Sequence, residues 1–367
     1  MPENFLSARG AERAAWSAMS VLLPLQTHLE AGRDLTADQV AGAVAALVAA
    51  EVPAEQKEAF LFALNTKGEK PAEVAAFAAE FRQLARDPGV AQWAGEAIDV
   101  VGTGGDHAGS FNISTATAFV LAAAGVKVMK HGNRSITSKC GSADLIAAIG
   151  VPLEAPLDRL QRSLAELNFC FFFAPAFHPA FKEIAPVRKA LAAKGRRSVF
   201  NILGPLINPG RPAFQLFGVY AREWVEPLAG ALHDLGLTAA LTIHGRVPGT
   251  DRGLDEWTTG TENFCAGAGR LRGPLTAVDL AATGLPAGRL DELQGGGPAE
   301  NLALFEALLD NRAPQTIADT VALNAGAGLW VAGRAKDLAA GVAQVQELLR
   351  DGSVKRHVER TRQFWRG

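Results

Sequence analysis

The stretch between residues 97 and 129 constrains the fold of this chain more than any other. The run AIDVV at 97–101 has the apolar, β-branched composition of a buried strand and leads directly into the glycine-rich turn GTGGD at 102–106. An alanine-rich helical stretch follows at 118–124, and a second strand-like run, GVKVM, occupies 125–129. Because strand, helix and strand in this order form a βαβ unit, the sequence predicts an α/β domain with parallel strands.

Further apolar runs extend this pattern towards the end of the chain. Strand-like segments at 215–220 and 239–244 alternate with helical segments at 224–234 and 300–309. Such alternation predicts a mixed, largely parallel sheet covered by helices. The closing stretch, 338–365, has the pattern of one long helix with many Lys and Arg, which is typical of a solvated helix face.

The first ninety or so residues show helical patterns. Thr36 and Gln39 have the spacing of a capping box ahead of an apolar helical face at 40–48. A second amphipathic run begins near Ala54, and Pro71 suits the first turn of a third helix. The sequence therefore predicts a small all-helical domain ahead of the α/β domain.

The length of 367 residues exceeds a single compact core and favours two unequal domains. We predict a helical domain over 1–93 and a large α/β domain over 94–178 and 201–367. The charged, helical stretch 179–200 lies between sheet-forming segments and is expected to pack back onto the helical domain. That domain would then be discontinuous in sequence.

The charge balance excludes a protein that coats nucleic acid through a general basic field. The chain carries 36 Lys and Arg against 38 Asp and Glu, a formal net charge of −2. No apolar run approaches the ~20 residues that span a bilayer, and the first residues, MPENFLSARGAER, lack the apolar core of a secretion signal. Cys140, Cys170 and Cys265 show no metal-type spacing. We therefore expect a cytoplasmic protein without nucleic-acid or membrane partners, in which local cations bind any anionic ligand.

The glycine-rich turn is the first of three candidate anion-binding segments. Three glycines within 102–105 let the backbone approach an anion and offer its amides, although many such turns are only turns. The second segment, SFNIST at 110–115, places hydroxyl and amide side chains at the entry to the next helix. These side chains could cap the helix, and a helix start also binds phosphate, so both interpretations use the same geometry.

The third candidate segment is KHGNRSITSKCGS at 130–142, directly after the second predicted strand. Lys130, Arg134 and Lys139 bring three cations together with several hydroxyls, whereas the chain as a whole is slightly acidic. A solvated loop is the alternative. The position beyond the carboxyl end of a strand favours a cradle for a polyphosphate.

Ordered motifs run along the whole chain. They are GTGGD at 102–106, FNIST at 111–115, KHGNR at 130–134, APVRK at 185–189, NILGPLINP at 201–209, GLDE at 253–256, LQGGGPAEN at 293–301 and LNAGAGLWVAG at 323–333. In this order the motifs resemble those of the anthranilate phosphoribosyltransferases. Such a set is far more specific than a glycine-rich turn alone.

The resemblance implies a fold of the nucleoside phosphorylase and phosphoribosyltransferase type, with a helical domain, an α/β domain and the active site in the cleft by the hinge. It implies a pentosyltransferase that moves the phosphoribosyl group of phosphoribosyl pyrophosphate to anthranilate in tryptophan biosynthesis, with Mg²⁺ as cofactor. It also implies a homodimer, and a glutaminase subunit of anthranilate synthase is a possible further partner.

The resemblance also assigns site residues. It places phosphoribosyl pyrophosphate at Gly102, Gly105, Asp106, Ser110, Asn112, Ile113, Ser114, Thr115, Lys130, His131, Gly132, Asn133, Arg134, Ser135, Ile136, Thr137, Ser138 and Ser142. It places Mg²⁺ at Ser114, Asp255 and Glu256, and anthranilate at Gly102, Asn133 and Arg188. The expected catalytic set is Lys130, Asn133 and Arg188.

Two of these assignments have a physical rationale of their own. The guanidinium of Arg188 can donate two parallel hydrogen bonds to the carboxylate of anthranilate, although a charge on a helix surface is the alternative. Asp255 and Glu256 form the carboxylate pair that Mg²⁺ prefers, although spacing alone also fits an exposed loop. The resemblance favours the functional interpretation in both cases.

The sequence departs from the family pattern at three places. Ser110 replaces the usual Thr and keeps the hydroxyl, and Cys140 replaces a usual Ser and is expected to be a packed small side chain. The stretch RVPGTDR at 246–252 lengthens the loop before GLDE. This longer loop bears on how the metal carboxylates are placed.

The expected mechanism is electrostatic, because the amine of anthranilate is already a neutral nucleophile and the difficult step is the departure of pyrophosphate. His131 is expected to shape the site rather than to act as a base. Two rivals remain. One is a paralogue of the same fold that binds nucleic acid. The other is a related pyrimidine nucleoside phosphorylase, whose characteristic lysine and glycine motifs are not evident.

Overall fold

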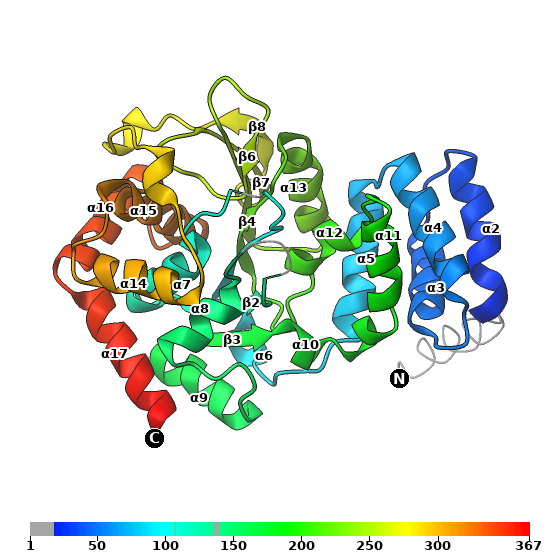
Figure 1. Cartoon of the computed structure of the whole chain (residues 1–367), viewed down its shortest axis with the longest axis horizontal. Coiled ribbons are helices and arrows are strands. Elements are labelled where there is room, and N and C mark those ends of the chain that lie inside the picture. Colours follow the sequence, from blue (N-terminus) through cyan, green and yellow to red (C-terminus); the bar gives the residue numbers. More distant parts are fainter. Residues whose placement is uncertain (1–17, 107, 136–138) are drawn as a thin grey trace, which may run out of the picture. The chain divides into compact units, whose positions relative to one another are not determined.

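A computed structural model describes residues 18–106, 108–135 and 139–367, and its contacts divide the chain into two compact units (Figure 1). The first unit comprises Met1–Ala85 and His178–Ile207, and its described part begins at residue 18. The second unit comprises Arg86–Phe177 and Asn208–Gly367. Both units are therefore built from two separate stretches of the chain.

These bounds differ from the expected domain ends at 93 and 200, for local physical reasons. Arg86 N donates a hydrogen bond to Phe177 O at 2.8 Å, and Val90 is buried in the core of the second unit. The stretch before residue 93 thus already belongs to that unit. At the other boundary, Arg82 Nε donates to Leu206 O at 2.7 Å and ties the residues after 200 to the first unit.

The first unit is all-helical. Its elements are α2 (Ala18–Glu30), α3 (Ala37–Val48), α4 (Ala54–Lys67), α5 (Pro71–Gln83), η1 (Pro179–Lys182), α11 (Ala185–Ala193), α12 (Phe200–Leu203) and η2 (Gly204–Leu206). The predicted capping box is confirmed: Gln39 N donates to Thr36 Oγ1 at 3.3 Å, and Thr36 N donates to Gln39 Oε1 at 2.9 Å. Pro71 begins α5 as expected.

A buried ion pair and an aromatic cluster hold the first unit together. Glu73, 1% exposed, accepts hydrogen bonds from Leu35 N and Lys70 N at 2.8 Å each and pairs with Lys67 at 2.6 Å. One carboxylate thus joins the start of α5 to two preceding loops. The Phe81 ring packs against the rings of Phe181 and Phe200, with centroids 5.1 and 5.5 Å away, and so joins α5 to the 178–207 stretch.

The second unit is built on one mixed sheet. Its strands are β1 (Ala97–Gly102), β2 (Lys127–Gly132), β3 (Phe169–Phe173), β4 (Phe214–Gly218), β5 (Ala239–Arg246), β6 (Gly253–Leu254), β7 (Glu262–Gly269) and β8 (Gly273–Ala277). The spatial order is β3-β2-β1-β4-β5-β7-β8, with β6 paired to β5. The pairs from β3 to β5 are parallel and those from β5 to β8 are antiparallel, which confirms the predicted mixed, largely parallel sheet.

Helices pack on both faces of this sheet. The helices of the second unit are α6 (Ala91–Ala94), α7 (Ile113–Ala123), α8 (Ser142–Ile149), α9 (Leu157–Leu167), α10 (Ala174–Phe177), α13 (Val225–Asp234), α14 (Pro298–Leu309), α15 (Gln315–Val331), α16 (Leu338–Arg350) and α17 (Ser353–Arg366), with short turns at η3 (Arg222–Trp224), η4 (Ala281–Thr283) and η5 (Leu290–Leu293). Helices α7 and α15 pack on one face, and α13 packs on the other over β5 and β7 (Figure 1). Every helix within the described ranges is too short or too polar to cross a bilayer.

The helical pattern predicted over 338–365 is confirmed, but one break divides it into two helices. The stretch forms α16 and α17, which are separated by a turn at Asp351 and Gly352. Gly352 adopts a φ of +75°, a conformation that glycine takes without strain. The turn lets α17 fold back, so that the side chain of Arg362 reaches Glu306 on α14.

Candidate active site

The glycine-rich turn begins where β1 ends, beside the point where the connections between strands switch from one face of the sheet to the other. The chain leaves β1 for α7 on one face of the sheet, whereas it leaves the neighbouring strand β4 for α13 on the other face (Figure 1). Open α/β sheets bind ligands at the carboxyl ends of strands beside such a switch. The topology therefore puts a candidate site beside Gly102.

Backbone hydrogen bonds fix the glycine-rich turn against Asp255. Gly104 N donates to Asp255 Oδ2 at 2.6 Å, and Thr103 N donates to Gly218 O at 2.9 Å. A Cβ on Gly102 would overlap Asp255 Oδ2 and lie 2.8 Å from its Cγ. Gly104 and Gly105 adopt φ angles of +66° and +79°. Glycine at 102 lets the carboxylate approach, and the next two glycines shape the turn that binds it.

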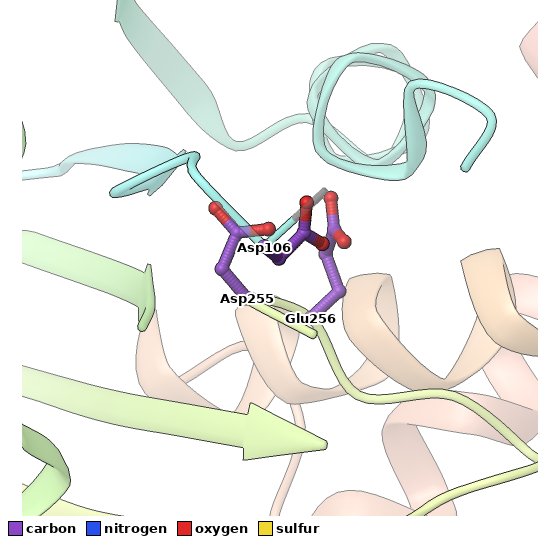
Figure 2. A group of neighbouring side chains, drawn as sticks. All are labelled: Asp106, Asp255 and Glu256. Carbon is purple, nitrogen blue, oxygen red and sulfur yellow. The ribbon is translucent and has the colours of Figure 1, made fainter. Parts of the chain in front are cut away.

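Three carboxylates gather beside this turn. Asp106, Asp255 and Glu256 each offer an oxygen, and the three oxygens lie within 4.8 Å of one another (Figure 2). Burial, followed by the charge of Asp106, raises the pKa of Asp255 to about 7. Burial, followed by the charge of Asp255, raises the pKa of Glu256 well above its ordinary value. Within the described residues, Glu256 Oε2 is buried without a hydrogen-bond partner.

This carboxylate cluster fits a divalent cation. Hard cations such as Mg²⁺ take oxygen ligands, and a cation would compensate the crowded negative charge and give the orphaned Glu256 Oε2 a partner. Asp106 was expected to bind phosphoribosyl pyrophosphate, and the structure brings it to the two expected metal ligands. The hydroxyl of Ser114, the other expected ligand, accepts a hydrogen bond from Lys130 Nζ at 3.3 Å.

Asn112 lies directly before α7 and joins separate segments of the site. Its side chain donates to Cys140 O at 3.1 Å and makes no cap bond to the first turn of α7 in the described structure. Its backbone N–H donates to Oδ1 of Asn301 at 3.0 Å, and its Nδ2 donates to the same oxygen at 3.2 Å. Asn301 is fully buried on α14 and also donates to the backbone carbonyls of Gly296 and Gly297. It thus ties the glycine run of LQGGGPAEN to the segment that contains SFNIST.

Lys130 is buried beneath the start of α7. It is 1% exposed, and its Nζ donates to Val100 O at 2.7 Å and to Ser114 Oγ at 3.3 Å. Burial lowers its pKa to about 8, which the charge of Asp99 opposes. Asp99 is fully buried as well, and burial raises its pKa to about 6, which the charge of Lys130 opposes. The charge of each buried group thus favours the charged form of the other.

Asp144 organises the polar loop that follows β2. Its carboxylate accepts hydrogen bonds from Gly141 N at 2.9 Å, Ser135 N at 3.2 Å and the Arg134 guanidinium at 2.8 Å. Arg134, expected as a phosphate ligand, is thus paired with a carboxylate. Ser142 Oγ donates to the backbone carbonyl of Asn133 at 3.4 Å.

The remaining predicted site residues within the described ranges lie at the ends of strands and at or just before the start of α7. His131, 4% exposed, and Gly132 form the end of β2, and Gly102 forms the end of β1. Ser110 bridges to Gln294. The buried Ile113 and Thr115 lie in the first turn of α7. Ile136, Thr137 and Ser138 lie outside the described residues.

Arg188 lies in the first unit, whereas the other described site residues lie in the second. It belongs to α11 and is half-buried, with its guanidinium 5.7 Å from the centre of the Phe200 ring. Burial lowers its pKa from its ordinary value. The side chain is thus a partly desolvated cation rather than a fully solvated charge.

The lengthened loop before GLDE closes as a hairpin. Gly245 pairs with Leu254 and Arg246 pairs with Gly253, and Val247 N donates to Arg252 O at 2.9 Å. Strand β6 then leads directly into Asp255 and Glu256, so the additional residues lie in a closed turn. Cys140 is buried, and burial raises the pKa of its thiol to about 11, as expected for a packed side chain.

Sequence reasoning missed three buried polar residues near this site: Asp99, Asn208 and Asn301. Signals were present for two of them. Asp99 is a charged residue inside the apolar run AIDVV, and Asn301 closes a motif to which no role was given. Asn208 lies in NILGPLINP, and its partners become visible only when the sheet is assembled.

Comparison with known proteins gives matches over both units. The helical bundle domain of a glycosyl transferase family matches residues 24–85, and the a/b domain of the same family matches residues 94–355. An anthranilate phosphoribosyltransferase of Rhodospirillum rubrum is 43% identical over 328 residues, which are 88% of this chain and 90% of that protein. One of Thermus thermophilus is 43% identical over 316 residues, 86% of this chain and 91% of that protein.

Solved structures agree. The crystal structure of the anthranilate phosphoribosyltransferase from Thermus thermophilus matches with a TM-score of 0.85 and 41% identity, covering 94% of this chain and 99% of that one. The enzyme from Saccharomyces cerevisiae, solved in complex with PRPP and Mg, has the same fold with a TM-score of 0.80, 23% identity and coverages of 95% and 99%. The chain belongs to the anthranilate phosphoribosyltransferases.

Proposed function

We propose that the chain transfers the 5-phosphoribosyl group of phosphoribosyl pyrophosphate to the amine of anthranilate, giving N-(5-phosphoribosyl)anthranilate and pyrophosphate for tryptophan biosynthesis. The observation that carries the proposal is the cluster of Asp106, Asp255 and Glu256 beside the glycine-rich turn. A turn rich in backbone amides beside a cation-binding cluster suits a magnesium diphosphate. Membership of the family supports the same substrates.

Mg²⁺ is the proposed cofactor. Asp255 and Glu256, with Asp106 from the turn and Ser114 from α7, would hold it. When bound, the ion supplies positive charge that stabilises pyrophosphate as a leaving group. The complex of the yeast relative with PRPP and Mg supports this choice.

The chain's own residues would lower the barrier by holding the leaving group. The bond between the anomeric carbon and the pyrophosphate oxygen breaks, the nitrogen of anthranilate bonds to that carbon, and the nitrogen loses a proton to solvent or pyrophosphate. Backbone amides at 102–106 and at the start of α7, with Lys130 beneath them, would stabilise the charge gathering on pyrophosphate.

The acceptor would be oriented by two polar side chains. Arg188 is the proposed contact of the anthranilate carboxylate, because a guanidinium matches a planar anion and the side chain is already partly desolvated. Asn133 and Gly102 are the other proposed contacts. Orienting the amine for attack at the anomeric carbon requires no general base.

The remaining proposals concern assembly and location. Family resemblance supports a homodimer in the cytoplasm, and association with a glutaminase subunit of anthranilate synthase is a further proposed assembly. Sedimentation of the purified chain, alone and with that subunit, tests both. No observation in the described residues favours nucleic-acid binding.

A coupled assay tests the reaction. The purified chain is incubated with anthranilate, phosphoribosyl pyrophosphate and Mg²⁺, and the loss of anthranilate fluorescence is followed. We expect loss only when all three are present, and none after chelation of the metal. A folded protein that leaves anthranilate unchanged under these conditions would contradict the proposal.

A further inference from the structure

The pairing of β1 with β2 ends before either strand does. Paired residues run only from Ala97–Lys127 to Ile98–Val128. By contrast, β1 stays paired with β4 as far as Gly102, and β2 stays paired with β3 as far as Gly132. The two strands therefore stay in the sheet but separate from each other at their carboxyl ends, where the site lies.

Side chains satisfy the backbone groups that this separation leaves without a ladder partner. His131 N donates to Asp99 Oδ1 at 3.3 Å, and Asn208 Nδ2 donates to Met129 O at 2.7 Å. Lys130 Nζ donates to Val100 O at 2.7 Å. Each side chain replaces a bond that a continued ladder would have made, so unpaired buried groups are avoided.

Asp99 lies at the centre of this arrangement. Its Oδ2 accepts from Asn208 Nδ2 at 2.8 Å, and Asn208 is itself held because its Oδ1 accepts from Gly210 N at 2.8 Å. Asp99 has an exposure of 0% and Asn208 of 2%, so neither is open to a substrate. The mechanism proposed above uses neither residue.

The buried charge of Asp99 has one cationic counterpart in this network, the ammonium of Lys130. Both groups are buried, and the charge of each opposes the effect of burial on the pKa of the other. Lys130 Nζ in turn donates to Ser114 Oγ in the first turn of α7. Hydrogen bonds thus run from Asn208 to Asp99 and on to the backbone of His131, the residue next to Lys130, and from Lys130 to Ser114 at the proposed pyrophosphate site.

We propose that Asp99, held by Asn208, is a positioning residue that fixes the Lys130 ammonium under Ser114 and so prepares the pyrophosphate site. This inference rests on the proposed function. Asp99 touches no substrate and acts through Lys130. The opposing view is that Asp99 only fills a gap between two strands and contributes stability alone.

Asp99→Asn separates these two views. The amide keeps the shape of the carboxylate but removes its charge. It also places an N–H donor where a carboxylate oxygen of Asp99 accepts the hydrogen bond from Asn208. We expect kcat/KM for phosphoribosyl pyrophosphate to fall roughly ten- to hundredfold while the KM for anthranilate stays within about threefold. A purely structural role would instead lower the melting temperature and leave both KM values unchanged.

A double-mutant cycle with Lys130→Gln gives the decisive readout. If Asp99 acts through Lys130, then Asp99→Asn has little further effect on kcat/KM once Lys130 is replaced. If the double variant instead loses kcat/KM by the product of the two single-variant factors, the two residues act independently and the proposal is overturned. Where turnover of the Lys130 variants is too slow, the Kd for phosphoribosyl pyrophosphate with Mg²⁺, measured by calorimetry, replaces kcat/KM in the same cycle.

Asp319→Asn is the matched control. Asp319 is 3% exposed on α15 in the same unit, and its Oδ1 accepts a hydrogen bond from Gln315. This variant should lower stability and leave the kinetics unchanged, and a loss equal to that of Asp99→Asn would contradict the proposal. If Asp99→Asn does not fold, Asn208→Ser should give a smaller loss of kcat/KM for phosphoribosyl pyrophosphate, again with the KM for anthranilate unchanged. Wild-type turnover is measured alongside, so failure of the reaction itself is distinguished from failure of this inference.

Discussion

Glycine at position 102 decides how closely the carboxylate of Asp255 can approach the turn. A Cβ there would overlap Asp255 Oδ2. We predict that Gly102→Ala displaces Asp255 and lowers kcat/KM at least about a hundredfold, because displacements near 1 Å carry such costs. The measurement is turnover as a function of Mg²⁺ concentration. The variant should bind Mg²⁺ more weakly and therefore need a higher Mg²⁺ concentration for half-maximal turnover.

Gly95→Ala provides the control for that variant. A Cβ on Gly95 would meet nothing within 4 Å, and its φ is −65°. The control should keep wild-type kinetics. Wild-type metal dependence in Gly102→Ala would show that Asp255 need not lie against the turn.

Arg188 carries the second prediction at the residue scale. Arg188→Ala should raise the KM for anthranilate roughly ten- to hundredfold and leave that for phosphoribosyl pyrophosphate unchanged, because a charge-assisted pair with the carboxylate is lost. Steady-state kinetics with each substrate varied in turn provide the test. Lys189→Ala, which removes the adjacent exposed cation, is the control. Equal loss for both substrates would refute the assignment.

At the scale of elements, Asn301 joins α14 to the start of α7. Asn301→Ala would leave the backbone N–H of Asn112 without its acceptor. We predict a rise of about tenfold in the KM for phosphoribosyl pyrophosphate and a loss of about 1–3 kcal/mol in the free energy of unfolding. Unchanged kinetics with lowered stability would mean that the contact serves only the fold.

Local signals explain which elements the sequence could predict. The capping box at Thr36 and the strand before GTGGD depend on residues close together in the chain, and both appear where they were expected. Strand β3 was not predicted, because its run FCFFF is short and uniformly apolar, and such a run fits a buried helix equally well. The break at Gly352 was missed because the apolar and basic pattern continues across it.

The site was predictable in its parts but not in its assembly. Motifs identified the glycine-rich turn, Asp255 and Glu256 from the sequence. The addition of Asp106 to the carboxylates depends on the turn folding against the segment after β6, about 150 residues further along the chain, as the span of the Gly104–Asp255 bond shows. The bonds from His131 N to Asp99 and from Lys130 to Val100 O likewise depend on neighbouring strands. Such contacts are set by sheet order, which no local pattern specifies.

At the scale of the whole molecule, stability should depend on pH through His178. This side chain is 5% exposed in the first unit, and burial lowers its pKa from 6.5 to about 4. In the unfolded chain the ring binds a proton below about pH 6.5, whereas in the folded chain it does so only near pH 4. The stability that neutral, buried His178 contributes to the folded protein is therefore complete above pH 6.5 and is lost as the pH falls towards 4.

The expected loss is about 3 kcal/mol over that range, at roughly 1.4 kcal/mol per pH unit. Chemical denaturation of the wild type and of His178→Gln at pH 7, 6 and 5 isolates the contribution, because other titrating groups are common to both. The gap in unfolding free energy between the two proteins should narrow as the pH falls. A gap that stays constant would show that His178 does not titrate between these limits.

We propose that Asp106, Asp255 and Glu256 converge on one divalent cation that also binds the diphosphate of the donor. A crystal of the protein with phosphoribosyl pyrophosphate and Mn²⁺, examined by anomalous scattering, tests it most directly. We predict a peak between these carboxylates, with at least two of them at metal–oxygen distances of about 2.0–2.5 Å and a pyrophosphate oxygen completing the shell. A bound donor with its cation held by none of the three would contradict the account.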